Sequence, residues 1–120
     1  MSNQFTLPEA GDSGVTADGT AWSSFGSGDA VVLIHGVGMQ QAYWAPQVHD
    51  LMRDYRVITF DMYGHGASDV VAGATDVRTY SEQLLRLLDS LHIDKAHIVG
   101  HSLGGLVATA FARSEEHTSE

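Results

Sequence analysis

The chain contains no cysteine, only two prolines and few basic residues among its 120 positions. Without cysteine it forms no disulfide bond and no cysteine-ligated metal site, which is typical of a reducing compartment, so we expect a cytoplasmic protein. Six Lys and Arg residues oppose 15 Asp and Glu residues, and the net charge of −9 disfavours nucleic acid and anionic membranes as partners. No apolar run approaches the roughly 20 residues of a membrane-spanning helix.

The composition that is present, with 43% hydrophobic and 18% charged residues, is that of one ordinary globular domain. Residues 1–13 are polar and unpatterned, and they lack the basic and apolar segments of a secretion signal, so we expect a flexible lead-in. From Gly14 to Ala112 the chain is patterned, with no internal repeat and no linker. We therefore expect one domain over residues 14–112.

Short apolar runs rich in β-branched residues predict buried strands at residues 30–34, 56–60 and 96–99. Upstream of these runs, Asp18-Gly19 predicts a tight turn between two shorter strands of a hairpin. Strands that alternate with helices predict an α/β fold with a parallel sheet and right-handed crossovers.

Helices are predicted where apolar side chains recur at helical spacing and so form one core-facing stripe. Asp76 is a predicted N-cap for the second helix. Small residues at 106–112 predict a third helix. The first stripe is Trp44, Val48, Leu51, Met52 and Tyr55, and the second is Tyr80, Leu84, Leu87, Leu88 and Leu91.

The segment Gly100-His101-Ser102-Leu103-Gly104 lies between the last predicted strand and the last predicted helix. A serine in a sharp strand-to-helix turn has its hydroxyl lifted clear of the backbone, as a nucleophile requires. Such a turn brings strand and helix close together, and only glycine at Gly100 and Gly104 leaves room for it. The amide of Leu103, in the first turn of the helix, then points at the oxygen that becomes negative when Ser102 attacks a carbonyl.

These five residues match the G-x-S-x-G nucleophile elbow, and the chain resembles the α/β-hydrolase family. The resemblance implies a mostly parallel sheet with helices on both faces and Ser102 as the nucleophile. It also implies that the loop His35-Gly36-Val37-Gly38 supplies a second oxyanion-hole amide, from Val37, with Gly36 beside it. An amide fixed in a glycine-flanked loop needs no reorganisation as charge develops, an effect on the order of a few kcal/mol per donor.

A third match is the loop at residues 61–68, DMYGHGAS, which fits the family's D-x-x-G-x-G-x-S pattern. We interpret this loop as structural, because its glycines allow sharp turns and Asp61 and Ser68 are able to bond loop amides. An alternative makes Asp61 the catalytic acid, but the family's acid follows the serine in chain order.

The resemblance covers residues 14–112 and ends before the positions where the family carries its catalytic acid and histidine. We therefore expect an incomplete α/β-hydrolase core that is inactive by itself. In it, Ile98 and Val99 lie on an unpaired apolar sheet edge, which favours aggregation. Residues 113–120 break the helix pattern and resemble a translated sequencing adapter, so we interpret them as a non-native tail, with an ordinary acidic tail as the alternative.

For the intact parent protein the resemblance implies a serine hydrolase that needs no cofactor or metal. The expected substrates are small-molecule carboxylic esters or lactones, because the loops resemble those of small cytoplasmic esterases and enol-lactonases. Carbon–carbon bond hydrolases, thioesterases and cofactor-free haloperoxidases share these motifs and are alternatives. Ser102 disfavours haloalkane dehalogenases and epoxide hydrolases, whose elbows carry Asp.

Two further alternatives belong to other functional classes, and the sequence leaves the oligomeric state open. The first is a metal site, since His35, His65, His101 and Asp61 all follow strand carboxyl ends, although none has the usual ligand spacing. The second is a non-catalytic, ligand-binding member of the fold.

Overall fold

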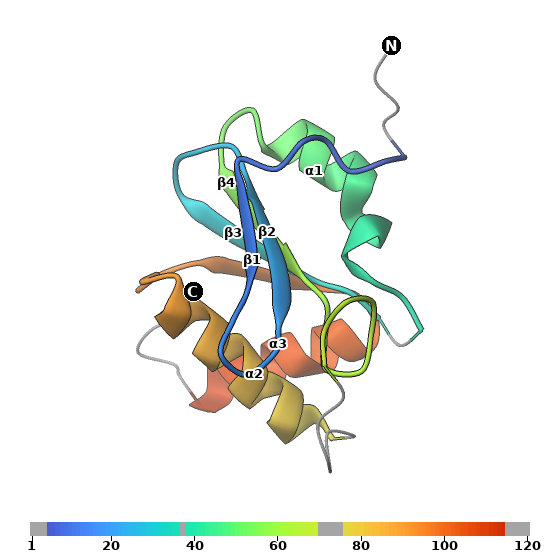
Figure 1. Cartoon of the computed structure of the whole chain (residues 1–120). Coiled ribbons are helices and arrows are strands. Elements are labelled where there is room, and N and C mark those ends of the chain that lie inside the picture. Colours follow the sequence, from blue (N-terminus) through green and yellow to red (C-terminus); the bar gives the residue numbers. More distant parts are fainter. Residues whose placement is uncertain (1–4, 37, 70–75, 115–120) are drawn as a thin grey trace.

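The computed structural model describes residues 5–36, 38–69 and 76–114 of the chain. Within these ranges five strands form one sheet in the order β1-β2-β4-β3-β5 (Figure 1). The strands β3, β4 and β5 are parallel, whereas β1 and β2 are antiparallel to their neighbours. This sheet confirms the predicted mostly parallel α/β architecture. The strands are β1 (Asp12–Val15), β2 (Ala21–Phe25), β3 (Ala30–Ile34), β4 (Arg56–Phe60) and β5 (His97–Gly100).

Some sequence predictions fall outside the described residues. They concern residues 1–4 of the predicted lead-in and residues 115–120 of the predicted tail.

The predicted strands at 30–34 and 56–60 are confirmed with those bounds, and the third lies one residue later than expected. The run at 30–34 is continuously apolar because alternate side chains enter two different cores. On β3, Val31 and Leu33 pack into a cluster with Trp44, whereas Val32 and Ile34 pack into the cluster on the opposite face.

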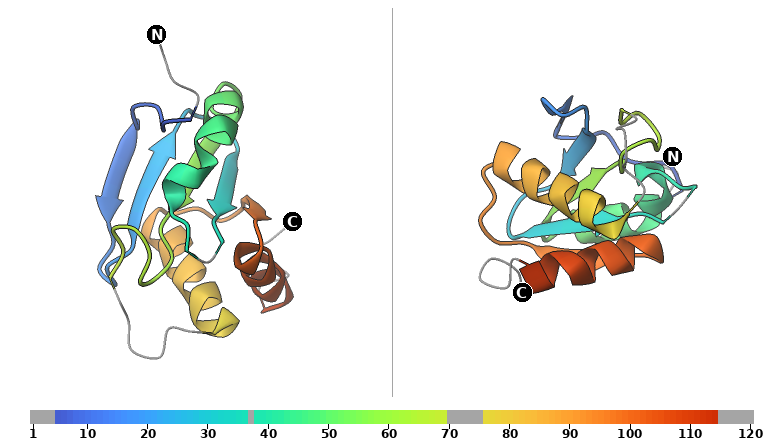
Figure 2. Two further views of the ribbon diagram at one scale, coloured as in Figure 1. Left: turned by 90° about the vertical axis from the view of Figure 1, so that its right-hand side faces the viewer. Right: turned by 90° about the horizontal axis from the view of Figure 1, so that it is seen from below.

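Helices cover both faces of the sheet (Figure 2). On one face, the 3₁₀ turn η1 (Gln41–Trp44) leads into α1 (Ala45–Leu51), and on the other lie α2 (Val77–Ser90) and α3 (Leu103–Ser114). The predicted N-cap of α2 is confirmed, because Asp76 Oδ1 accepts a hydrogen bond from Thr79 N at 2.8 Å. The predicted stripe is confirmed for Tyr80, Leu84, Leu87 and Leu88, which are buried, whereas Leu91 lies just beyond the end of α2 and is half-buried.

The predicted extent of the first helix is wrong, because α1 ends at Leu51 and Tyr55 lies beyond it. Two amides, those of Asp54 and Tyr55, converge on the carbonyl oxygen of Leu51, at 3.1 and 2.9 Å, and so turn the chain toward β4. Tyr55 still packs against the α1-side core, which explains why it fits the apolar stripe.

The predicted hairpin exists, but its turn is longer than the Asp18-Gly19 pair and its first strand begins at Asp12 rather than Val15. Side chains in the turn compete with the strand pairing. Thr20 N donates to Thr16 Oγ1 at 3.1 Å, and the Thr16 hydroxyl donates to the Asp18 carboxylate. The strands therefore stop at Val15 and resume at Ala21.

Register places the carboxyl ends of the three parallel strands level with one another. Ile34 pairs with Phe60 on one side and with Gly100 on the other. The loops that begin at His35, Asp61 and His101 therefore start from the same edge of the sheet.

Strand β5 is the last strand in the order found among the described residues. Val99 on this strand is 42% exposed. The predicted apolar edge is thus present in the described part of the chain.

Candidate active site

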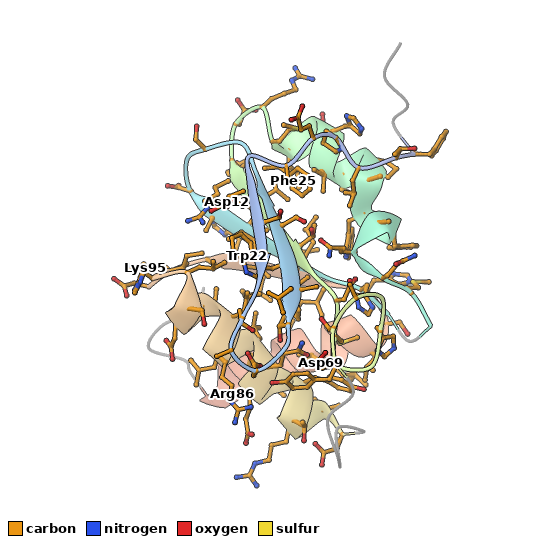
Figure 3. The ribbon with its side chains drawn as sticks, in the orientation of Figure 1. Asp12, Trp22, Phe25, Asp69, Arg86 and Lys95 are labelled. Atoms are coloured by element: carbon orange, nitrogen blue, oxygen red, sulfur yellow. The ribbon has the colours of Figure 1, made fainter. Side chains whose placement is uncertain are left out.

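Three loops meet at the edge of the sheet where β3, β4 and β5 have their carboxyl ends, and we call this edge the carboxyl edge. They follow β3, β4 and β5, and each carries one of the motifs found in the sequence. Figure 3 marks the two ends of the sheet: Asp69 belongs to the loop after β4, whereas Lys95 precedes β5 at the far end.

Ser102 occupies the turn between β5 and α3 with a φ of 57°, in the left-handed region. Ser102 is exposed. Two backbone hydrogen bonds hold the turn around it: His101 N donates to Ile34 O at 3.0 Å, and Gly104 N donates to His101 O at 2.9 Å. A non-glycine residue in this region costs on the order of 1–3 kcal/mol and persists only where its surroundings enforce it.

His92 also has a positive φ, of 56°, but its position is ordinary. It follows the C-terminus of α2, where a left-handed residue commonly ends a helix and its neighbours satisfy the last carbonyls. Ile93 N donates to Leu88 O at 2.9 Å in this way. No helix precedes Ser102, so helix termination does not explain its conformation.

Glycines make the close approach at this turn possible. A Cβ atom added at Gly100 would lie 2.1 Å from the Gly104 oxygen, and one added at Gly104 would lie 2.3 Å from the Ile34 oxygen. Gly36 borders the same turn, since a Cβ there would lie 3.3 Å from Ser102 Cβ. The loop after β3 and the turn that carries Ser102 are therefore in contact.

Of the two predicted oxyanion-hole amides, the structure describes that of Leu103 but not that of Val37. Leu103 is the first residue of α3, so its N–H is one of the helix N-terminal donors that have no acceptor within the helix. Val37 lies outside the described residues. Beside it, Met39 N donates to Gly36 O at 3.2 Å.

His35 is fully buried between the loops after β3 and β4. Its Nδ1 donates to Gly36 O at 2.7 Å, because a carbonyl oxygen only accepts, and its Nε2 accepts from Met62 N at 2.9 Å. Burial lowers the pKa of His35 below its ordinary value of 6.5, although the hydrogen bond to Gly36 opposes the shift. His35 is therefore a neutral structural bridge with no nitrogen left for a metal or a substrate.

We expect His35 to make the protein less stable in mild acid. Because its pKa is lower in the folded chain than in the unfolded chain, its stabilising contribution is complete above about pH 6.5 and is lost as the pH falls through the folded pKa. Urea midpoints measured from pH 8 to pH 5 should fall for the unmodified protein and for His97→Gln, which alters an exposed histidine. In His35→Gln the slope below pH 6.5 should flatten, and an unchanged slope would contradict this assignment.

Asp61 is 2% exposed, and its carboxylate accepts hydrogen bonds from loop amides. Gln41 N donates to Oδ1 at 2.7 Å and Ala67 N donates to Oδ2 at 3.0 Å. Ser68 Oγ accepts from Ala21 N at 2.9 Å and donates to the Asp61 carbonyl oxygen. Both side chains thus make the backbone hydrogen bonds that the predicted structural role requires, and Asp61 ties η1 to the β4 loop.

Gln83 has a part in the site that the sequence analysis missed. It is fully buried on α2, where its Oε1 accepts from Tyr63 N at 3.0 Å and its Nε2 donates to Thr20 Oγ1 at 2.9 Å and to Asp61 O at 3.1 Å. The sequence offered one signal for its burial, because Gln83 is a polar residue on the same helix face as the apolar Tyr80 and Leu84. Gln83 therefore links α2 to the loop after β4.

A second contact fixes the same loop to the hairpin. The Tyr63 hydroxyl donates to the Asp18 carboxylate, and Arg86 Nη1 on α2 donates to the Tyr63 oxygen at 3.2 Å. Burial raises the pKa of Tyr63, and the bond to Asp18 raises it further. For Asp18, burial alone would raise the pKa, but the hydrogen bonds from Thr16 and Tyr63 hold it below its ordinary value.

Tyr43 and His101 form a ring contact across the site. Their ring centroids are 5.1 Å apart and their planes are inclined by 32°. Tyr43 belongs to η1, and His101 directly precedes Ser102. The sequence alone did not predict this contact.

Among the described residues, no group of three or more His, Asp or Glu side chains is placed to hold a metal ion. Over the same residues, no helix has the length and apolar character needed to cross a membrane. A cavity of about 420 Å³ lies at the amino ends of the parallel strands, lined by Ala30, Arg56 and His97 among others. None of its lining residues belongs to the three loops at the carboxyl edge.

Residues 29–118 match the model of a protein family described as alpha/beta hydrolase fold. The 3-oxoadipate enol-lactonase 1 of Acinetobacter baylyi is 44% identical over 79 residues, which are 66% of this chain and 29% of the lactonase. The (E)-2-((N-methylformamido)methylene)succinate hydrolase of the same organism is 37% identical over 84 residues, which are 70% of this chain and 32% of that hydrolase.

Among solved structures, the enol-lactonase from Burkholderia xenovorans LB400 superimposes with a TM-score of 0.80 at 30% identity. The match covers 84% of this chain and 40% of the lactonase chain. The chain spans about a third of the length of the curated relatives it matches.

Proposed function

Because the chain belongs to the alpha/beta hydrolase fold family, we propose that the protein is a serine hydrolase that cleaves small carboxylic esters or lactones through an acyl-enzyme. The observation that carries the proposal is the conformation of Ser102. This exposed serine has a φ of 57° in the turn between β5 and α3, where Gly100 and Gly104 allow the backbone segments to approach closely. A strained residue that its surroundings enforce is typical of a catalytic position.

In the proposed reaction, Ser102 Oγ attacks the acyl carbon while a histidine takes its proton. The ester carbon–oxygen bond then breaks, and the leaving alkoxide receives that proton. Water, activated by the same histidine, next attacks the acyl-enzyme and releases the acid and the free serine. The Val37 and Leu103 amides hold the oxyanion in both steps.

The histidine base and its acidic partner belong, in this proposal, to a part of the protein beyond these 120 residues. Two histidines of the segment are unsuited to the task. His35 uses both ring nitrogens in backbone hydrogen bonds, and His101 lies next to Ser102 in the chain with its ring against Tyr43.

The substrate class rests on the relatives, whose names describe a lactonase and a hydrolase of a succinate derivative. Acyl transfer by serine needs no cofactor, so we propose none. We also keep the cytoplasm as the proposed compartment, because the chain has no cysteine.

A fluorophosphonate probe tests the proposal, because it reacts only with an activated serine. We expect the protein at its full natural length to be labelled at Ser102, and Ser102→Ala to lose the label and at least about 10³-fold of ester or lactone hydrolysis. Ser27→Ala, which changes another exposed serine, serves as the matched control and should keep both. Labelling that persists in Ser102→Ala, or a full-length protein that takes no label, would rule the proposal out.

A further inference from the structure

The elbow turn is held mainly by its backbone, and one side-chain contact joins it to another element. The His101 and Ile34 backbones are hydrogen-bonded, and Gly36 touches the turn. Beyond these, the His101 ring packs on Tyr43 of η1, with a centroid distance of 5.1 Å. Within the described residues, neither ring nitrogen of His101 has a hydrogen-bond partner, so the stack is what orients this ring.

Tyr43 is itself well anchored, although its side chain is 44% exposed. Its ring meets the edge of Trp44, with centroids 5.4 Å apart and planes inclined by 77°. Trp44 is buried and packs in the α1-side core with Leu33 and Val48. Because Tyr43 is fixed to the core through Trp44, its ring is able to restrain the His101 ring that it contacts.

The opposite end of η1 is fixed as well. Gln41 N donates to the buried Asp61 carboxylate at 2.7 Å, and Tyr43 N donates to Gln40 O at 3.0 Å. The short element is thus held at its start by the β4 loop and at its end by Trp44. Tyr43 projects from a support that has little freedom to shift.

We propose that Tyr43 is a positioning residue for Ser102, an inference that rests on the serine-hydrolase function proposed above. Through the ring contact with His101 it holds η1 against the elbow, which carries Ser102 and the Leu103 amide. The serine oxygen and this amide must both meet the reacting carbonyl, and a displacement of about 1 Å in an aligned site is enough to slow the reaction severely. Tyr43 therefore acts on the acylation step and leaves substrate affinity unchanged.

The test compares Tyr43→Leu with Tyr43→Phe in the full-length protein. Active sites are counted by fluorophosphonate labelling, and kcat is expressed per labelled site so that unfolded protein does not count. We expect Tyr43→Leu to lower kcat and the rate of labelling roughly two- to tenfold, the equivalent of one aromatic pair, with KM unchanged. Tyr43→Phe keeps the ring and should retain the unmodified values.

Two further variants separate positioning from stability. Tyr55→Leu alters a half-buried tyrosine that packs on the same core and lies away from Ser102, so it should lower the melting temperature without lowering kcat per labelled site. The double variant of Tyr43→Leu with His101→Ala should be no slower than the slower single variant, because both changes break the same contact.

The possible outcomes are distinct. Normal labelling of the unmodified protein together with an unchanged kcat in Tyr43→Leu would overturn the positioning role and leave the proposed function standing. A raised KM at constant kcat would also overturn it, since Tyr43 would then be a wall of the substrate site. No labelling of the unmodified protein would remove the proposed function and the positioning role with it.

Discussion

Gly104→Ala is expected to lower the free energy of unfolding by about 3 kcal/mol, at the upper end of overpacking effects. The added Cβ would lie 2.3 Å from the Ile34 oxygen and 2.7 Å from the His35 oxygen. Both obstacles are backbone atoms at the end of β3, so no side chain is able to rotate out of the way. The helix α3 would have to move off the sheet, and Ser102 with it.

Gly105→Ala is the matched control for this prediction, because it adds the same methyl group to the next residue of the same helix. Its nearest neighbour would be the Gly100 oxygen at 3.6 Å, an ordinary contact. Alanine is also the better helix former, so we expect a gain of roughly 0.5–1 kcal/mol. Urea denaturation of the two variants should give shifts of opposite sign, and equal shifts would contradict the close approach of α3 to β3.

Asp61→Ala should destabilise the protein by about 2 kcal/mol or more, because it removes the acceptor of several part-buried donors, each at a cost of about 1–3 kcal/mol or less where water replaces the acceptor. The donors are the backbone amides of Gln41 and Ala67 and the side-chain amide of Gln41. Asp54→Ala, at an exposed aspartate, should change stability by less than about 0.5 kcal/mol. Thermal or urea unfolding of both variants measures the difference.

Asp61→Asn decides between the structural role and the alternative role as catalytic acid. In Asn, an NH₂ group replaces one carboxylate oxygen. This NH₂ group donates rather than accepts, so it opposes the N–H donors that bond to Asp61 and lowers the stability of the protein. The structural role predicts a lower urea midpoint, with fluorophosphonate labelling retained in the folded fraction. An unchanged midpoint with labelling abolished would instead make Asp61 a catalytic residue.

The sheet was predictable from the sequence because its parallel strands are buried on both faces. Residues 30–34 are a continuous apolar run whose side chains enter a core on one face or the other, and the apolar residues Val57, Ile58 and Phe60 of β4 do the same. The need for glycine at position 100 was predictable because the atom that a side chain there would meet, the Gly104 oxygen, belongs to the same turn. Gly104 was predictable only from the motif, because the atoms that it avoids are the backbone oxygens of Ile34 and His35 at the end of β3.

The parts that were missed depend on contacts between segments far apart in the chain. The position of Gln83 on the apolar stripe of α2 indicates burial, but its partners Thr20, Tyr63 and the Asp61 carbonyl come from distant segments that the sequence does not bring together. The Tyr43–His101 stack likewise needs the register of β3 and β5, which brings η1 next to the elbow. The length of the hairpin turn depended on hydrogen bonds among Thr16, Asp18 and Thr20, which a two-residue turn pattern does not include.

The most direct measurement is a crystal structure of the full-length protein after reaction with a fluorophosphonate. Our account predicts a covalent bond from phosphorus to Ser102 Oγ, with the phosphoryl oxygen about 3 Å from the backbone nitrogens of Val37 and Leu103. An adduct on any other residue would contradict it, as would a phosphoryl oxygen that faces away from both amides.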